Sequence, residues 1–314
     1  MDKQVLHITN GGRVTSRLNE LEIEGERLTW QEIICEGPTL EQIYKQDFID
    51  FRCKFLNDFY NIDLDLNQVD TEVKKLEDAN NKYYKIVLWF EYHLFCHMNM
   101  IAVINLLHEL KINIPIYIVS SGRTKGSKTF KTLIELSRNQ FLNLYKNPIL
   151  LPLKDIDLIT TIWGIYCGKD HNLLKPFIVK SSSFEYLSNC LKAHLERFPN
   201  SEDGLNILER NILKIIKNNA IKSKHHLLGY AVNYQGYYGY TELQLIRIID
   251  KLNIFYSEEE HSLTLNRKGH EALLGQRNFS AELDNQMIYG GVKKHDFQFN
   301  KKLNKLVKTV SNAN

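Results

Sequence analysis

The few cysteines of the sequence are not spaced for a disulfide framework or a zinc site. There are five, Cys35, Cys53, Cys96, Cys167 and Cys190, and no two of them form a C-x-x-C pair. Disulfide scaffolds use even numbers of cysteines, and cysteine-built zinc sites use close pairs. We therefore expect reduced thiols in a cytoplasmic protein.

Long apolar runs and an excess of one charge are missing as well. No run approaches the roughly eighteen apolar residues of a membrane-spanning helix, and residues 1–10 lack the basic start and apolar core of a signal peptide. The 40 basic and 37 acidic side chains leave a net charge of +3. This balance favours neither a membrane nor nucleic acid as partner, so only local clusters of charge could indicate either.

What remains is an average globular composition with a repeated strand–helix pattern. The hydrophobic fraction is 43%, the charged fraction is 25%, and 314 residues suit two domains. The apolar pattern predicts strands at residues 5–9, 26–30, 85–90 and 115–119, and helices at 13–21, 40–60 and 94–110. Alternating strands and helices predict a parallel sheet, and hence a Rossmann-like α/β domain over residues 1–125.

The rest of the chain has a different, mostly helical pattern. Residues 126–200 contain no convincing strand, so we expect a helical connector that ends at the turn-rich segment 199–204. Helices are then predicted at 205–218, 224–232, 241–252 and 267–274, with a two-stranded hairpin within 254–265. This order predicts a winged-helix-like domain over residues 201–280, followed by a tail over 281–314.

Four short segments that carry polar or flexible residues are expected at one edge of the sheet. In an open parallel sheet, ligands bind beyond the carboxyl ends of the strands. The segments expected there are Asn10-Gly11-Gly12, Glu36-Gly37, Glu91 to His93, and Ser120 to Arg123.

Two of these segments have the chemistry of an anion site. The glycine loop of residues 10–12 can offer backbone N–H groups to a phosphate at the start of a helix, although it is neither a G-x-G-x-x-G fingerprint nor a P-loop. Ser120, Ser121 and Arg123 combine hydroxyl groups with a bidentate anion binder. A tight strand–helix turn and an ordinary surface loop are the alternatives, and the sequence leaves them open.

The segment around Glu91 offers candidate catalytic and metal-binding residues. Glu91 is a candidate general base, with His93 beside it. His93 and His97 lie four residues apart, so one face of a helix would present both to a metal ion. The alternatives are that Glu91 caps the following helix and that this helix is packed into the core.

The winged-helix-like half could contact nucleic acid or a protein. Its candidate recognition helix balances Glu242 and Asp250 against Arg247 and Lys251, whereas phosphate neutralisation favours a basic face on a DNA-reading helix. A group of tyrosines could stack on bases or pack the two domains together. These are Tyr230, Tyr234, Tyr237, Tyr238 and Tyr240.

Several short motifs are similar to those of one bacterial family. They are HITNG at residues 7–11, EGP at 36–38, VLWFEY at 87–92, HLERFP at 194–199 and GLN-x-LE at 204–209. Together they make the chain resemble domain of unknown function 1835, an uncharacterised family in which many members carry a winged-helix-like C-terminal half. The resemblance covers most of the chain and implies an architecture, not an activity. Relatives typically have an acid where this chain has Gly12 and His93, so an activity that needs those acids would be lost or altered here.

The leading hypothesis is that the Rossmann-like crevice binds a nucleotide or another phosphorylated small molecule. Residues 10–12 and Arg123 would hold the phosphate, Glu91 would bond to a sugar hydroxyl, and the C-terminal half would be an interaction module. The alternatives are a metal-assisted enzyme acting on nucleotides or phosphodiesters, a DNA-binding regulator and a plain scaffold. The sequence identifies no cofactor.

Overall fold

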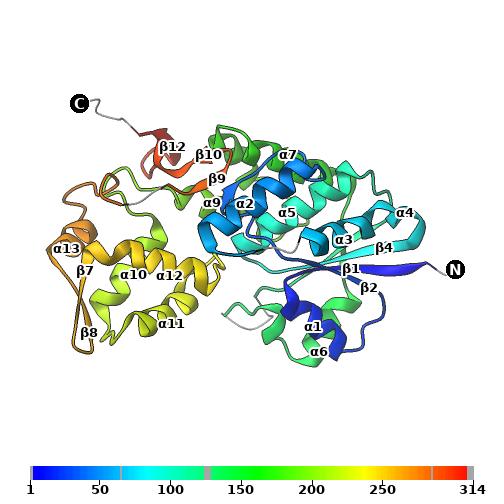
Figure 1. The fold of residues 1–314 in the computed structure, drawn as a ribbon, viewed down its shortest axis with the longest axis horizontal. Helices are drawn as coiled ribbons and strands as arrows, with labels where there is room; N and C mark the ends of the chain where they lie inside the picture. Colours follow the sequence, from blue (N-terminus) through cyan, green and yellow to red (C-terminus); the bar gives the residue numbers. More distant parts are fainter. Residues whose placement is uncertain (1–2, 64–65, 124–128, 284–285, 310–314) are drawn as a thin grey trace.

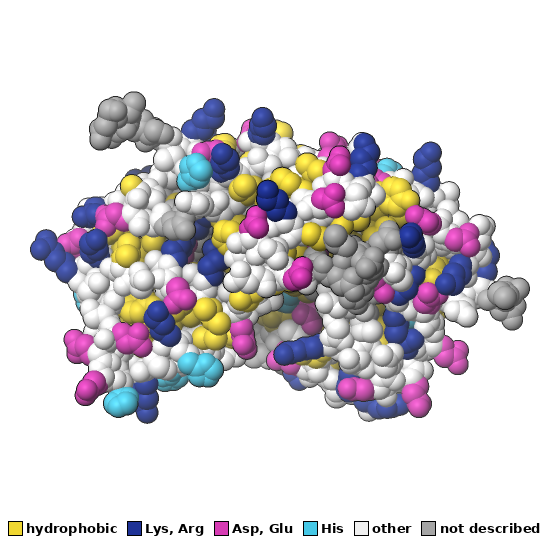
Figure 2. Space-filling model, viewed as in Figure 1, with side chains coloured by type: hydrophobic (Ala, Val, Ile, Leu, Met, Phe, Trp, Pro, Cys, Tyr) yellow, Lys and Arg dark blue, Asp and Glu magenta, His cyan; other side chains and the backbone are white. Residues whose placement is uncertain are grey.

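The computed structural model describes residues 3–63, 66–123, 129–283 and 286–309, without the side chains of residues 66–70. The first half of the chain forms a sheet between two layers of helices, and the second half is mostly helical (Figure 1). Figure 2 shows basic and acidic side chains intermixed over one face of both halves.

The sheet has the strand order β2-β1-β4-β5-β6. Its strands are β1 (Gln4–Asn10), β2 (Glu26–Trp30), β4 (Tyr83–Phe90), β5 (Ile116–Ser120) and β6 (Ile149–Leu150). The first four pair in parallel, with Ile8 of β1 opposite Leu28 of β2 and Leu88 of β4, and β6 runs antiparallel to β5. The predicted α/β class with a mostly parallel sheet is confirmed.

Helices cover both faces of this sheet (Figure 1). One face carries α1 (Gly12–Glu20) and α6 (Arg138–Lys146), and the other carries α2 (Gln46–Tyr60), α3 (Leu66–Glu77), α5 (Leu94–Glu109) and α7 (Leu153–Cys167). Leu88 of β4 packs in the apolar cluster that includes α5, whereas Val87 and Trp89 pack in the cluster with α1 and α6. Burial on both faces explains why the sequence of β4 is an almost continuous apolar run.

One strand lies where the sequence predicts none. The described part of residues 126–200 contains the expected helices, which include α8 (Lys175–Ile178) and α9 (Leu187–Glu196) beside α6 and α7. It also contains β6, which adds two exposed residues to the edge of the sheet. A strand this short gives no alternating pattern that sequence reasoning could detect.

The helix predicted over residues 40–60 is too long at its start. Helix α2 begins only at Gln46. The backbone N–H groups of Ile43 and Tyr44 instead donate to the carboxylate of Glu109 at 3.0–3.1 Å. Because a side chain from α5 satisfies these donors, the preceding segment has no need of a helical turn.

The second half contains the helices and the hairpin predicted for it. In chain order these are α10 (Ile207–Asn218), α11 (Lys224–Tyr234), α12 (Glu242–Lys251), β7 (Tyr256–Glu259), β8 (Ser262–Leu265) and α13 (Arg267–Leu274). Asn206 with Glu209 and Thr241 with Gln244 form capping boxes that start α10 and α12. The strands β7 and β8 pair antiparallel.

The tail returns to the first half of the chain. Its strands are β9 (Ile288–Gly290), β10 (Val292–Lys293), β11 (Phe297–Asn300) and β12 (Lys305–Lys308). Strand β9 pairs in parallel with β3 (Gly37–Pro38), which lies within the EGP motif. Gly290 has a φ of +60°, and an added Cβ would lie 2.0 Å from the carbonyl oxygen of Tyr166. This position therefore requires glycine.

The structure also gives the state of the cysteines and the character of the helices. All five cysteines are free. Within the ranges given above, none of the helices has the length and apolarity of a membrane span.

Candidate functional site

The strand order reverses between β1 and β4, because the chain continues from β1 to β2 on one side and from β4 to β5 on the other. The carboxyl ends of strands at such a switch point form the ligand crevice of open α/β sheets. Asn10 ends β1 at this point: its Nδ2 donates to Sγ of Cys96, and its Oδ1 accepts from Nδ2 of Asn99, both at 2.7 Å. Asn10 therefore ties β1 to the first turns of α5.

The glycine loop leaves the N-terminus of α1 open. Gly11 has a φ of +86°, and its N–H donates to the carbonyl oxygen of Trp30 at 3.0 Å. No described side chain caps α1, and a Cβ built at Gly11 or Gly12 meets no described atom within 4 Å. Gly12 and Arg13 are exposed. Free backbone N–H groups at the positive end of a helix dipole form an anion site.

Glu91 has a partner inside the protein at each carboxylate oxygen. Its Oε1 accepts the N–H of Leu133 at 2.7 Å, at the start of the 3₁₀ turn Leu133–Glu135. Its Oε2 lies 3.0 Å from Nε2 of His93. Glu91 is thus held by Leu133 and His93, and the residue that caps the following helix α5 is His93, not Glu91.

The predicted metal pair of His93 and His97 is not the group that the structure brings together. His93 is the N-cap of α5 with φ −100° and ψ 165°, so the helical four-residue spacing does not apply to this pair. His97 is 3% exposed, its Nδ1 lies 3.2 Å from the carbonyl oxygen of His93, and burial lowers its pKa to about 4. The ligand atoms close to the His93 imidazole belong to Glu91 and Cys96, whereas His97 contacts the backbone carbonyl of His93.

Glu91, His93 and Cys96 form the group that could hold a metal ion. One ligand atom from each lies within 4.8 Å of the other two. Carboxylate oxygen, imidazole nitrogen and thiolate sulfur are all zinc ligands. Burial raises the pKa of the Cys96 thiol well above its usual value, so a metal would have to displace the thiol proton.

The serine–arginine segment after β5 is divided between the interior and the surface. Ser121 is 2% exposed, and its Oγ has no hydrogen-bond partner among the residues described. Ser120 Oγ donates to the carbonyl oxygen of Ser121 at 3.3 Å. The guanidinium of Arg123 lies over the ring of Phe130, 5.1 Å from its centroid, and the Arg123 N–H donates to the hydroxyl of Tyr186 at 2.9 Å.

A tyrosine-rich segment of the second half covers the start of α5. The N–H of Leu94 donates to the carbonyl oxygen of Tyr237 at 2.7 Å. Gly239 has a φ of +62°, and a Cβ there would lie 2.0 Å from Nδ1 of His93. Tyr238 is buried as well. This part of the tyrosine group therefore packs the two halves together.

Glu36 does not face the crevice, although the sequence places it among the ligand-binding residues. It is 1% exposed and forms an ion pair with Nη2 of Arg247 at 2.6 Å. It also accepts hydrogen bonds from Nε2 of Gln244 at 3.0 Å and from the hydroxyl of Tyr60. Burial alone would raise the pKa of Glu36, but Arg247 and the two hydrogen bonds hold it below its usual value. Glu36 thus links the first half to α12.

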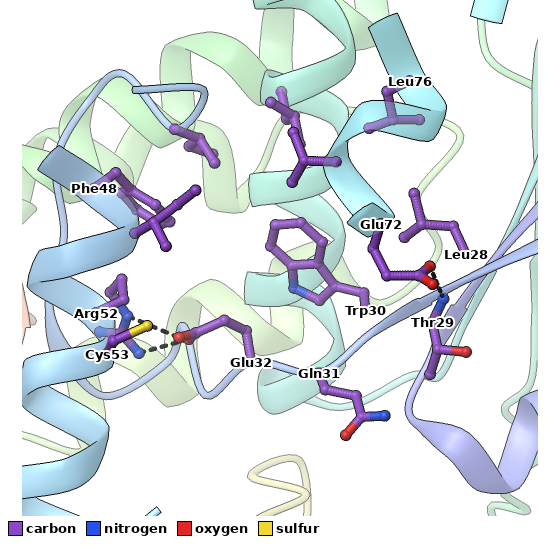
Figure 3. Close-up of a pocket in the computed structure, with 14 residues that line it drawn as sticks. Leu28, Thr29, Trp30, Gln31, Glu32, Phe48, Arg52, Cys53, Glu72 and Leu76 are labelled. Carbon is purple, nitrogen blue, oxygen red and sulfur yellow. Dashed lines mark hydrogen bonds and ion pairs between the residues drawn. The ribbon is translucent and has the colours of Figure 1, made fainter. Parts of the chain in front are cut away.

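A cavity of about 850 Å³, its open mouth included, lies between β2, α2 and α3 (Figure 3). Its wall is mostly apolar and includes Leu28, Ile43, Phe48, Ile49, Val73, Leu76 and Leu106. Among its polar residues, Glu32 forms an ion pair with Arg52 at 2.6 Å, and Glu72 accepts the N–H of Thr29 at 3.2 Å. A concave apolar wall with a small number of fixed polar groups is typical of a small-molecule site.

The indole of Trp30 lies between the two acidic groups of this cavity (Figure 3). Its Nε1 is buried and has no hydrogen-bond partner in the described part of the chain. A buried donor without a partner costs about 1–3 kcal/mol. A ligand that offers an acceptor atom would remove this cost.

The cavity borders the glycine loop directly. Trp30 pairs with Asn10 in the sheet and accepts the N–H of Gly11. The amide of Asn99 donates both to Oδ1 of Asn10 at 2.7 Å and to the carbonyl oxygen of Glu32 at 2.8 Å. The cavity and the open end of α1 are therefore two parts of one continuous edge.

Sequence reasoning missed Trp30, Glu32 and the cavity around them. A usable signal was present, since Glu32 follows β2 roughly twenty residues after Gly12, the spacing at which nucleotide-binding sheets carry an acid for the ribose. Comparison with known proteins adds nothing here: no family model matches the chain, and no curated protein matches it.

Proposed function

We propose that the chain binds a nucleotide, or another phosphorylated small molecule, along the carboxyl edge of its sheet. The base and sugar would occupy the cavity beside Trp30, and the phosphate would lie at the N-terminus of α1. The observation that carries the proposal is the indole N–H of Trp30, which has no partner among the described residues, in an apolar cavity beside a helix that no described side chain caps.

The cavity residues suit a nucleoside. Trp30 and Phe48 offer aromatic surface to a base, and Glu32 and Glu72 offer carboxylate oxygens to sugar hydroxyl groups. This assignment replaces the role first expected of Glu91, because Glu32 and Glu72 line the cavity and Glu91 does not. The Rossmann-like interpretation of the sheet belongs to the same proposal.

The phosphate is better placed outside the cavity than within it. Inside the cavity the charge of Arg52 is already paired with Glu32, whereas the first N–H groups of α1 and the exposed Arg13 would attract an anion. Gly12 adds no negative charge at this point. Ser121, with its unpartnered hydroxyl, and Arg123 remain candidates for a longer phosphate chain.

The second half is proposed to be a winged-helix-like interaction module, as the resemblance to domain of unknown function 1835 also implies. A protein partner is favoured over DNA, because Arg247 and Lys251 of α12 are engaged in ion pairs with Glu36 and Glu209. Free thiols at all five cysteines support a cytoplasmic location as part of this proposal.

A metal-assisted enzyme is the second candidate, and the cluster of Glu91, His93 and Cys96 favours it. This candidate requires that the purified protein retains a divalent metal and that Cys96→Ser loses it. Metal-free protein of unchanged stability and ligand affinity would remove the candidate.

The proposed function is tested by calorimetric titration with a purine nucleotide, its nucleoside and inorganic phosphate. We expect the nucleotide to bind more tightly than either of its parts, because it uses both the cavity and the helix start. No binding of any nucleotide would overturn the proposal.

A pair of variants on α2 tests the location. Ile49→Trp fills the cavity and should weaken nucleotide binding at least tenfold. Asp50→Trp adds the same side chain at an exposed neighbouring position that does not line the cavity, so it should bind as the wild type does. Equal affinity in both variants would mean that the base lies elsewhere.

A further inference from the structure

A second, smaller cavity lies where the two halves of the chain meet. Its empty volume, with the space open to solvent included, is about 250 Å³. The residues around it come from segments far apart in the sequence: Arg197 follows α9, Tyr238 and Tyr240 precede α12, and Arg247 belongs to α12. Three motifs noted in the sequence, EGP, HLERFP and GLN-x-LE, each contribute a residue to its wall.

Positive charge exceeds negative charge around this cavity. Four cationic side chains line it, whereas the wall contains only two carboxylates, Glu36 and Glu209. The cations are Arg197, Arg247, Lys251 and Lys294. Glu36 pairs with one of them, and Glu209 pairs with both lysines through the same Oε1. The charge of Arg197 is therefore left without a carboxylate of its own, and the two lysines share one.

Arg197 is the clearest uncompensated charge. It is 1% exposed, and no carboxylate in the described ranges forms an ion pair with it. Its guanidinium donates to the carbonyl oxygen of Cys35, lies 2.6 Å from Nδ1 of His194 and stacks 3.6 Å from the ring centroid of Tyr289. Burial lowers the pKa of His194 well below its usual value, so that imidazole is neutral. A buried charge without a counter-ion is costly.

Four buried polar atoms around the cavity have no partner in the described structure. They are Nε of Arg197, Nε of Arg247, and the hydroxyl oxygens of Tyr238 and Tyr240. Each of these groups can donate a hydrogen bond, and two of them carry positive charge. Ordered water would satisfy such donors, but it would leave the excess charge uncompensated.

We propose that this cavity is a binding site for a small monatomic anion, a halide such as chloride. The anion accepts hydrogen bonds from Arg197, Arg247 and the two tyrosine hydroxyls, and it neutralises part of the excess charge. The enclosed space takes about one water-sized sphere, which excludes a nucleotide. Because its donors come from both halves, the bound anion holds the halves together.

The experiment follows thermal unfolding of the full chain at constant ionic strength. Chloride or phosphate replaces gluconate, an anion too bulky for the cavity, over a range of concentrations. We expect the melting temperature to rise and to saturate with chloride, whereas phosphate, which is larger than the enclosed space, should act as gluconate does. The absence of a saturable rise with chloride would overturn the proposal.

Tyr240→Phe separates the proposed site from a general salt effect and from the nucleotide site. The variant removes one donor and keeps the shape of the side chain, so the dissociation constant of the anion should rise at least tenfold. Its stability in gluconate should equal or exceed that of the wild type, because the removed hydroxyl has no partner among the described residues. Tyr234→Phe, at a tyrosine that is 65% exposed, is the control and should change neither quantity.

Two results with these variants would contradict the proposal. One is an unchanged anion affinity in Tyr240→Phe, which would place the ion elsewhere. The other is a loss of stability of this variant in gluconate, which would mean that the hydroxyl is already bonded within the protein. Neither result depends on whether nucleotides bind.

Discussion

Replacing Gly12 by aspartate should stabilise the protein and weaken its ligand binding at the same time. Gly12 is the first residue of α1, it is exposed, and a side chain there meets no described atom. An acid in the first turn of a helix interacts favourably with the helix dipole. The same carboxylate would occupy the place that we assign to the phosphate.

The two effects can be estimated separately. Removing glycine contributes about 0.4–1 kcal/mol through the unfolded state, and an acid in the first turn adds about 0.3–1 kcal/mol. Two like charges 4 Å apart repel by about 1 kcal/mol in water and about 4 kcal/mol at the effective dielectric constant of a protein surface. The nucleotide should therefore bind tenfold or more weakly, although the fold is more stable.

The matched control is Gly12→Asn, which has the same shape without the charge. Urea unfolding gives the stability of both variants, and calorimetry gives their nucleotide affinity. We expect the asparagine variant to bind at least tenfold more tightly than the aspartate variant. Equal dissociation constants for the two variants would refute the placement of the phosphate at α1.

Three further predictions concern the junction between the two halves. Glu209→Gln should cost about 3–5 kcal/mol in urea unfolding, because it leaves the buried ammonium groups of Lys251 and Lys294 without their carboxylate; a loss below about 1 kcal/mol would contradict this. Burial and the charge of Lys294 lower the pKa of Lys251 to about 7. Above that pH the unfolded chain binds more protons than the folded protein, so the free energy of unfolding in gluconate should rise from pH 7 to 10. Lys251→Met should remove this rise, and a rise that persists in the variant would contradict the assignment to Lys251. Gly239→Ala should lower the free energy of unfolding by about 1–3 kcal/mol more than Gly236→Ala does, because both glycines have positive φ but only Gly239 lies against the imidazole of His93. Equal melting temperatures of the two variants would show that Gly239 and His93 are not in close contact.

The strands were predictable because their burial requires a local run of apolar residues. A parallel strand between two helix layers must be apolar on both sides, and β4 has that composition. Helix α3 was predictable too, because Leu66, Val69, Val73 and Leu76 recur at helical spacing, although the sequence analysis predicts no helix there. The start of α2 was not predictable, because it depends on the carboxylate of Glu109, which lies more than sixty residues further along the chain.

The candidate site divides in the same way. The glycine loop and the end of β4 could be placed at one edge, because the carboxyl ends of parallel strands meet there. The partner of Glu36 could not be foreseen, because Arg247 is 211 residues away. The four-residue spacing of His93 and His97 predicts a shared helix face only if both residues are helical, whereas His93 is the extended N-cap.

Hydrogen exchange of the backbone amides, measured with and without a nucleotide, tests the central claim most directly. One ligand that spans the cavity and the helix start should protect residues 10–15 together with residues 28–33, and should leave α10 to α13 unchanged. Protection confined to the second half, or no protection at saturating nucleotide, would contradict the assignment of this edge as the binding site.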